Sequence, residues 1–172
     1  NLCAVIDDRA YMRESPDRAR WSLTTTLIVI NTAVFVLGLI AALIWPQGYG
    51  RALGYLALSP LGLARGWIWQ LLTFQFLHAG MFHLIINCVM LYFFGRPLEQ
   101  SLGRPFFLRL YFGSGAVGGL LQVAFAWIFP AHFGPGGVVG ASAGIFGLIA
   151  AFAVLNREAP ITTLVAFVIP VT

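Results

Sequence analysis

The chain has 172 residues, of which 59% are hydrophobic and only 9% are charged, whereas an ordinary soluble domain carries about 25% charged residues. This composition excludes a soluble globular protein and predicts an integral membrane protein. All ten basic residues are arginines, and the six acidic residues leave a net charge of +4. Most of the arginines lie between apolar runs, and they form no stripe with interleaved aromatic residues. We therefore expect no nucleic-acid partner.

The N-terminal segment is polar and rich in Asp, Glu and Arg. It lacks the apolar core of a signal peptide, so we expect residues 1–21 to be a cytoplasmic tail and residues 22–172 to be a membrane domain. The two cysteines, Cys3 and Cys88, lie in this tail and in an apolar run, and a disulfide between them is not expected. The chain starts without Met and stops inside an apolar run, which predicts a longer natural polypeptide.

The first uncharged run covers residues 23–45, which at about 1.5 Å per residue is long enough for a ~30 Å hydrocarbon core. Residues 50–77 mix aromatic and polar side chains, which predicts an interfacial loop with short helices. A second apolar run covers residues 81–95. It is short for a span unless preceding residues add a turn, and we expect residues 95–103 to form a compact polar connector.

No charged residue occurs between residues 110 and 156. This stretch predicts two spans separated by the Pro- and Gly-rich residues 130–137, and a further span is expected to begin at Ile161. The expected fold is therefore an all-α, polytopic transmembrane helix bundle with about five spans in this chain. Only Arg51 and Arg65 fall on the side of the membrane opposite the tail, so the positive-inside rule predicts a cytoplasmic N-terminus.

The stretch from Val139 to Phe152 carries one hydroxyl among small residues. Gly140, Gly144 and Gly147 recur at i, i+4 and i+7, which on a helix gives a smooth stripe that allows close backbone approach. Ser142 falls at the first turn, where backbone N–H groups lack partners and the helix dipole favours negative charge. The stretch is thus either a packing face or the site of a serine nucleophile.

Two polar side chains in the second span, His83 and Asn87, are four residues apart and share one helix face. Polar side chains within spans are candidates for function, although these two are also compatible with hydrogen bonds between packed helices. No second histidine or carboxylate has metal-ligand spacing on that face, so we expect no metal and no cofactor. His132 is interpreted as a solvated loop histidine. If the helices touch, His83 and Asn87 can donate hydrogen bonds to an oxyanion formed at Ser142.

These residues resemble the motifs of the rhomboid intramembrane serine proteases. The segment from His78 through His83 to Asn87 is similar to the family's His-x4-His-x3-Asn pattern, residues 95–103 are similar to its Glu-containing connector, and Gly140-Ala-Ser142 is similar to its serine motif. The resemblance covers roughly residues 22–172. It implies a six-helix core that cleaves transmembrane-segment protein substrates within the lipid bilayer through a Ser–His dyad.

The same resemblance implies a role for each matching residue. Ser142 would be the nucleophile, and His83 and Asn87 would stabilise the oxyanion together with the Ser142 N–H. His78 and Gly140 are possible supporting residues. The dyad histidine belongs to the family's sixth helix, so it is expected beyond Thr172. The expected location is a bacterial inner membrane.

Two departures from the family's pattern stand out. Ala143 follows the serine where the family usually has glycine, and it is expected to narrow the space beside the scissile bond. Gln70 follows Trp69 where the family often has arginine, which removes a charge that would anchor the loop.

The alternative function is a catalytically inactive rhomboid-like protein that binds transmembrane helices. A transporter is disfavoured, because the sequence shows no paired halves with matching broken helices, and we expect no buried carboxylate that could couple ions.

Overall fold

The computed structural model describes residues 21–133 and 136–157, and these ranges are helical apart from connections that include one isolated β-bridge. An apolar helix of 14 residues, Ser142–Leu155, accompanies longer helical segments. Within these two ranges, three segments are long and apolar enough to cross a membrane: Leu23–Ile44, Met81–Leu102 and Arg104–Ile128. The predicted all-α transmembrane bundle is therefore confirmed. The tail, except for Trp21, and the span expected from Ile161 lie outside the described residues.

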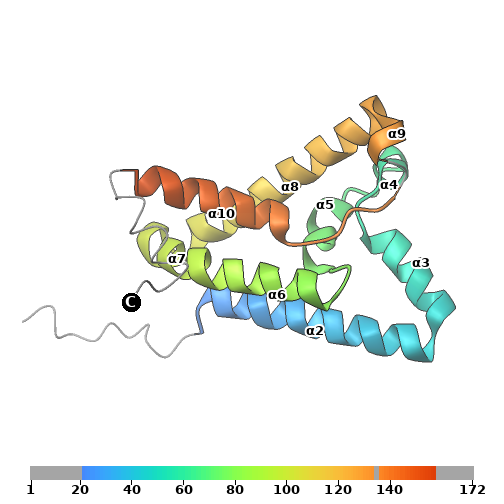
Figure 1. Cartoon of the computed structure of the whole chain (residues 1–172), viewed down its shortest axis with the longest axis horizontal. Helices are drawn as coiled ribbons and strands as arrows, with labels where there is room; N and C mark the ends of the chain where they lie inside the picture. The colour runs from blue at the N-terminus through green and yellow to red at the C-terminus, as the bar shows by residue number, and fades with distance from the viewer. Residues whose placement is uncertain (1–20, 134–135, 158–172) are drawn as a thin grey trace, which may run out of the picture.

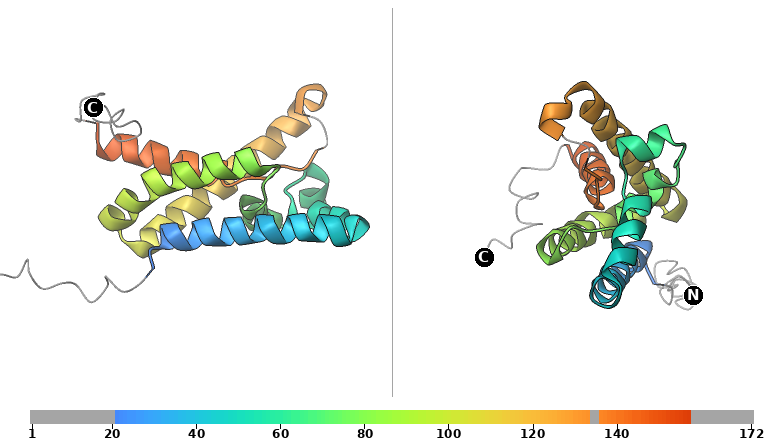
Figure 2. Two further views of the ribbon diagram at one scale, coloured as in Figure 1. Left: turned by 60° about the horizontal axis from the view of Figure 1, so that its bottom comes forward. Right: turned by 90° about the vertical axis from the view of Figure 1, so that its right-hand side faces the viewer.

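The first long helix, α2 (Leu23–Ile44), has a well-defined start. The Ser22 hydroxyl accepts a hydrogen bond from Thr25 N at 3.1 Å, which satisfies one of the N–H groups that the first turn leaves free. Pro46 then opens α3 (Pro46–Leu56), so the chain breaks where the sequence predicted. The short helices α3, α4 (Pro60–Ala64) and α9 (Pro130–Phe133) gather at one end of the bundle, and α7 (Arg96–Leu102) lies at the opposite end (Figures 1 and 2).

The second span differs from the prediction at its C-terminal side. The helix α6 (Met81–Met90) continues through a π-helical turn, η4 (Leu91–Gly95), into α7 (Arg96–Leu102). The residues predicted to form a polar connector are therefore mostly helical and supply the missing length of the span. The wide π turn lies just before Pro97, which has no N–H to continue a regular α-helical pattern. The segment ends at Gly103, whose φ of +76° favours glycine.

Helices α8 (Arg104–Ile128) and α10 (Ser142–Leu155) pack closely through small residues. A Cβ at Gly144 would lie 2.8 Å from the Tyr111 carbonyl oxygen, and one at Gly147 would overlap the side chain of Ser114. The Ser114 hydroxyl also donates to the Gly144 carbonyl at 3.2 Å. The glycine stripe thus allows the predicted close approach, but Gly144 and Gly147 face α8.

The loop between the first two spans contains the predicted short helices, α4 (Pro60–Ala64), α5 (Gln70–Thr73) and the 3-10 turn η3 (Phe74–Phe76). Gln70 occupies the position at which the family often has arginine, and it is fully buried. It anchors the loop through hydrogen bonds and not through a charge. Its side-chain oxygen accepts from Ser59 N at 3.1 Å, and its Nε2 donates to the Tyr55 carbonyl at 3.2 Å. The loop is therefore anchored without the arginine.

The buried carboxylate of Glu99 joins α7 to the start of α2. Its oxygens accept hydrogen bonds from Leu23 N at 2.7 Å and from the N and Oγ1 of Thr24 at 3.0 Å each. A negative charge at this point also matches the positive end of the α2 dipole. Arg104 lies at the surface nearby, with its Nε 3.9 Å from Glu99 Oε1. This contact fixes the α7 end of the bundle.

Candidate active site

The segment that leads into α10 is held by backbone hydrogen bonds to the loop before α6. Val138 and Leu58 exchange N–H···O bonds of 2.7 and 3.1 Å, and Gly140 N donates to the Phe74 carbonyl at 2.9 Å. Gly140 has a φ of +130°, which side chains other than glycine's rarely allow. These contacts fix the direction in which the chain enters α10, and with it the position of Ser142.

Ser142 is the first residue of α10 and follows the fully buried Ala141. No side chain caps this end of the helix, and the first backbone bond of the helix runs from Ile145 N to Ala141 O at 3.0 Å. The N–H groups of the first turn thus have no partner within the helix, and the positive end of the dipole lies beside them. This arrangement is suited to hold a negatively charged oxygen next to the Ser142 hydroxyl.

Gly140 brings the hydroxyl of Ser142 and the imidazole of His83 to one point. A Cβ added at Gly140 would lie 2.7 Å from His83 Cε1, 2.8 Å from His83 Nε2 and 3.6 Å from Ser142 Oγ. The His83 ring thus takes the space that a methyl group would need, and the Ser142 hydroxyl lies at van der Waals distance from the same point. The predicted proximity of the second span and the serine helix is present, and it depends on Gly140 rather than on the whole glycine stripe.

His78 lies in the loop just before α6, with its ring edge-on to that of His83 and a centroid distance of 5.3 Å. The side chain is buried. Burial, followed by repulsion from a charge on His83, lowers the pKa of His78 to about 4. The His78 ring is therefore neutral at pH 7, and it supports one side of the His83 ring.

Asn87 lies one helical turn beyond His83 on α6 and is buried. Its Nδ2 donates to the carbonyl of His83 at 2.7 Å. A side-chain amide has two N–H groups, so this bond leaves one of them for another acceptor. The bond back to its own helix holds the amide on the face that also carries His83.

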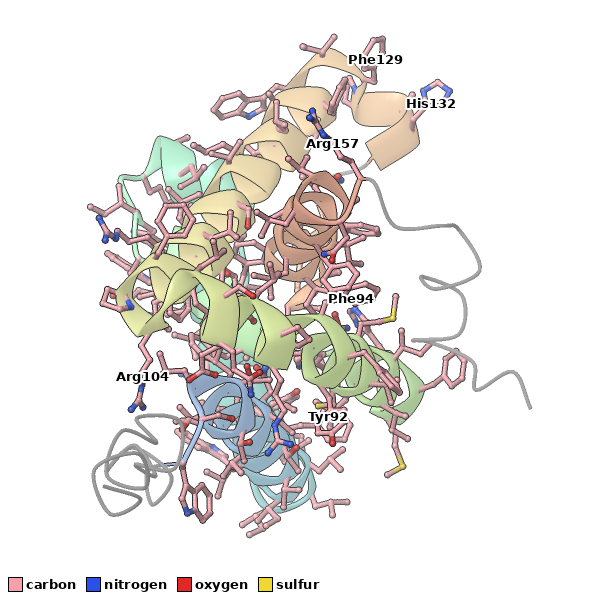
Figure 3. The ribbon with its side chains drawn as sticks, turned by 90° about the vertical axis from the view of Figure 1, so that its left-hand side faces the viewer. Tyr92, Phe94, Arg104, Phe129, His132 and Arg157 are labelled. Atoms are coloured by element: carbon pink, nitrogen blue, oxygen red, sulfur yellow. The ribbon has the colours of Figure 1, made fainter. Side chains whose placement is uncertain are left out.

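Two other residues singled out in the sequence lie away from this point. Ala143 faces α8, because a Cβ at Gly118 would lie 2.9 Å from the Ala143 methyl group. The alanine methyl group therefore contributes to the packing of α10 against α8. His132 is exposed on α9 (Pro130–Phe133) and points outward in Figure 3.

The positions of Phe74 and Leu58 in the site were not predicted. Both are buried apolar residues that act here through backbone atoms. Any residue type supplies the same carbonyl and N–H groups, so the sequence holds no side-chain signal for them. Within residues 21–133 and 136–157, no three or more His, Cys, Asp or Glu side chains gather as a metal site would require.

The fold and the site define a polytopic helical membrane protein in which a serine opens one helix beside a histidine from a neighbouring span. Over residues 65–172 the sequence matches the Rhomboid domain family. The chain therefore belongs to the rhomboid family, and the resemblance found in its motifs is confirmed.

The curated relatives include proteases and an inactive protein. Putative rhomboid protease YdcA of Bacillus subtilis (strain 168) is 38% identical over 92 residues, which are 54% of this chain and 43% of that protein. Inactive RHOMBOID-like protein 8 of Arabidopsis thaliana is 39% identical over 84 residues, 49% of this chain and 22% of that protein. Rhomboid protease GluP of Bacillus subtilis (strain 168) is 33% identical over 99 residues, 56% of this chain and 18% of that protein.

This chain spans less than half the length of each of these three relatives. No solved structure gives a significant match.

Proposed function

We propose that residues 22–172 belong to the membrane domain of an intramembrane serine endopeptidase that cleaves transmembrane-segment protein substrates. Ser142 is the nucleophile, and the histidine that takes its proton lies beyond Thr172. The Ser142 N–H, His83 and Asn87 stabilise the oxyanion, while His78 and Gly140 support the position of the His83 ring.

The observation that carries this proposal is the meeting of His83 and Ser142 at Gly140. Helix packing alone gives no reason for a histidine and a serine hydroxyl to occupy the space beside a glycine with a φ of +130°. A hydrolytic site needs both a hydroxyl and nearby hydrogen-bond donors. The uncapped first turn of α10 adds backbone donors at the same place.

The reaction assigns a separate task to each group. Ser142 Oγ attacks the substrate carbonyl as its proton passes to the base, and the carbonyl oxygen becomes negatively charged. Donors fixed in advance stabilise this charge more than the neutral substrate, which lowers the barrier. As the intermediate collapses, the peptide C–N bond breaks and the amine leaves with the proton from the base. Water then gives a proton to the base, hydrolyses the ester on Ser142 and releases the acid, which restores the hydroxyl.

The proposed setting is a multi-pass protein of a bacterial inner membrane with a cytoplasmic N-terminus. The arginines support this orientation, since Arg96, Arg104 and Arg109 lie near the α7 end of the bundle while Arg51 and Arg65 belong to the loop at the other end. Ser142 then lies towards the outer side.

The proposal is tested with Ser142→Ala in the full-length protein, using cleavage of a reporter transmembrane substrate. Cleavage should disappear while expression and folding stay unchanged. The matched control is Ser101→Ala, because Ser101 is exposed on α7 and bonds only to the Pro97 carbonyl at 2.8 Å among the described residues. Continued cleavage by the Ser142 variant would refute its assignment as nucleophile.

The second candidate is a rhomboid-like protein that binds transmembrane helices without cutting them. It is favoured by the 39% identity to the inactive Arabidopsis thaliana protein. A fluorophosphonate probe distinguishes the two functions, because it reacts only with an activated serine. Labelling of Ser142 in the full-length protein supports the protease, and its absence together with substrate binding supports the inactive binder.

A further inference from the structure

A pocket at the loop end of the bundle is separate from the Ser142 site. It has a volume of about 320 Å³, at the lower end of the range for small-ligand sites. Its walls come from the end of α3 and from the segment around α4, and the pocket is lined by Arg51, Gly54, Tyr55, Ser59, Leu61, Gly62, Arg65 and Trp67. Arg51 and Arg65 are the two arginines that the sequence predicts on the side of the membrane opposite the N-terminal tail.

The positive charge of this pocket is not balanced within the described part of the chain. Arg51 and Arg65 are exposed, and Glu99 is the only acidic residue in ranges 21–133 and 136–157. Glu99 is bound to the start of α2, at the α7 end of the bundle and far from α3 and α4 in Figure 1. Two arginines thus line one small pocket, and no carboxylate from these ranges lines it with them.

The remaining walls suit a ligand with a charged and an apolar part. The guanidinium of Arg65 lies 5.5 Å from the centroid of the Trp67 ring, a cation–π contact that limits its orientations. Tyr55, Trp67 and Trp69 form an aromatic cluster, with centroids 4.8 to 5.9 Å apart. Such rings are typical of the lipid headgroup level, and Leu61 exposes an apolar side chain at the pocket.

We propose that this pocket binds the phosphodiester of an anionic phospholipid. Arginine matches phosphate oxygens with a planar set of donors, and Tyr55, which also lines the pocket, carries a hydroxyl that can donate a further hydrogen bond. The aromatic cluster holds the loop at headgroup level, where the phosphate of a lipid is present at high local concentration, and Leu61 contacts the start of the acyl chains.

The test compares lipid binding by the full-length protein in nanodiscs of phosphatidylcholine with 20% phosphatidylglycerol, or of phosphatidylcholine alone. Bound lipid is counted by native mass spectrometry after release from the nanodisc. Each arginine near an anionic lipid contributes about fivefold in affinity, so Arg51→Gln/Arg65→Gln should weaken retention of phosphatidylglycerol about 25-fold. Arg51→Gln alone should weaken it about fivefold.

The control is Arg96→Gln/Arg109→Gln, which removes the same charge from the α7 end. If the control variant retains phosphatidylglycerol, the proposal is supported. If it loses as much phosphatidylglycerol as the Arg51/Arg65 variant, the effect is one of general charge and the proposal is overturned. Size-exclusion chromatography verifies that each variant is folded, and the single Arg51 variant gives the answer if the double one fails to fold. A second arm titrates inorganic phosphate. Binding of phosphate without retention of phosphatidylglycerol would overturn the assignment to a lipid.

Discussion

His83 and Asn87 share one face of α6, but different contacts hold the two side chains in place. His83 touches the space beside Gly140 and Ser142, while Asn87 is fixed by its bond to the His83 carbonyl. In the proposed reaction both act on the oxyanion. Their effect should therefore appear in kcat more than in substrate binding.

We expect His83→Ala and Asn87→Ala each to lower kcat by about 10²–10³-fold, the usual cost of removing one oxyanion donor. The measurement is the rate of cleavage of a reporter substrate by the full-length protein, separated into kcat and KM. Asn156→Ala is the matched control for Asn87, because Asn156 Nδ2 makes the same bond to the carbonyl four residues earlier, at 2.8 Å.

The Asn156 variant loses that helix bond without approaching the site, so it should cleave at the normal rate. Full activity in both His83→Ala and Asn87→Ala would instead assign these side chains to helix packing.

Individual site residues were predictable where side-chain chemistry carries the signal. A serine at a helix start and two polar residues on one face of an apolar helix can be recognised from spacing. The strand-like pairing of Leu58 with Val138 and the bond from Gly140 to Phe74 were not predictable, because backbone groups make them. The sequence therefore indicates candidate side chains for the site but not the framework that positions them.

Among the helix pairs, α8 and α10 depend most directly on glycine. Gly147 faces Ser114 so closely that an added methyl group would overlap its side chain, whereas a methyl group at Gly113 would meet nothing within 4 Å. Both glycines lie inside helices. They differ mainly in whether another helix lies against them.

We expect Gly147→Ala to lower the free energy of unfolding by about 1–3 kcal/mol, the usual cost of overpacking. Gly113→Ala should leave it unchanged or raise it by up to about 1 kcal/mol, because alanine is the better helix former. The measurement is reversible unfolding in mixed detergent micelles. Equal effects of the two substitutions would show that the stripe does not hold α8 and α10 together.

The helices themselves were predicted well where apolar runs were long, and poorly where charge interrupted them. The end of α2 and the break before α10 agree with the Pro and Gly signals. Residues 96–102 were expected to leave the membrane segment because they contain Arg, Pro and Glu. They remain helical because Glu99 finds its hydrogen-bond donors at the start of α2, which a reading of local composition does not reveal.

For the molecule as a whole, Glu99 makes a long-range polar contact, since it joins residues 75 and 76 positions apart. Removing the carboxylate would leave two backbone N–H groups and the Thr24 hydroxyl without this acceptor. Hydrogen bonds to charged groups contribute about 1.5–3 kcal/mol each. The start of α2 would then be free to separate from α7.

We expect Glu99→Ala to lower the free energy of unfolding by about 3 kcal/mol, and Glu99→Gln by less, because its amide oxygen still accepts a hydrogen bond. The control is Gln100→Ala, a neighbouring exposed position on α7. Thermal unfolding of the purified full-length protein measures both. A loss in Gln100→Ala as large as in Glu99→Ala would contradict the assigned role of the carboxylate.

The shortness of α10 sets the depth of Ser142. Its 14 residues rise about 21 Å, against a hydrocarbon thickness of roughly 30 Å. With Asn156 and Arg157 at one boundary of the membrane, the hydroxyl lies about 9 Å inside the other. The proposed hydrolysis at that depth would require water where lipid chains would otherwise lie, so bilayer thickness would determine how well this serine is hydrated.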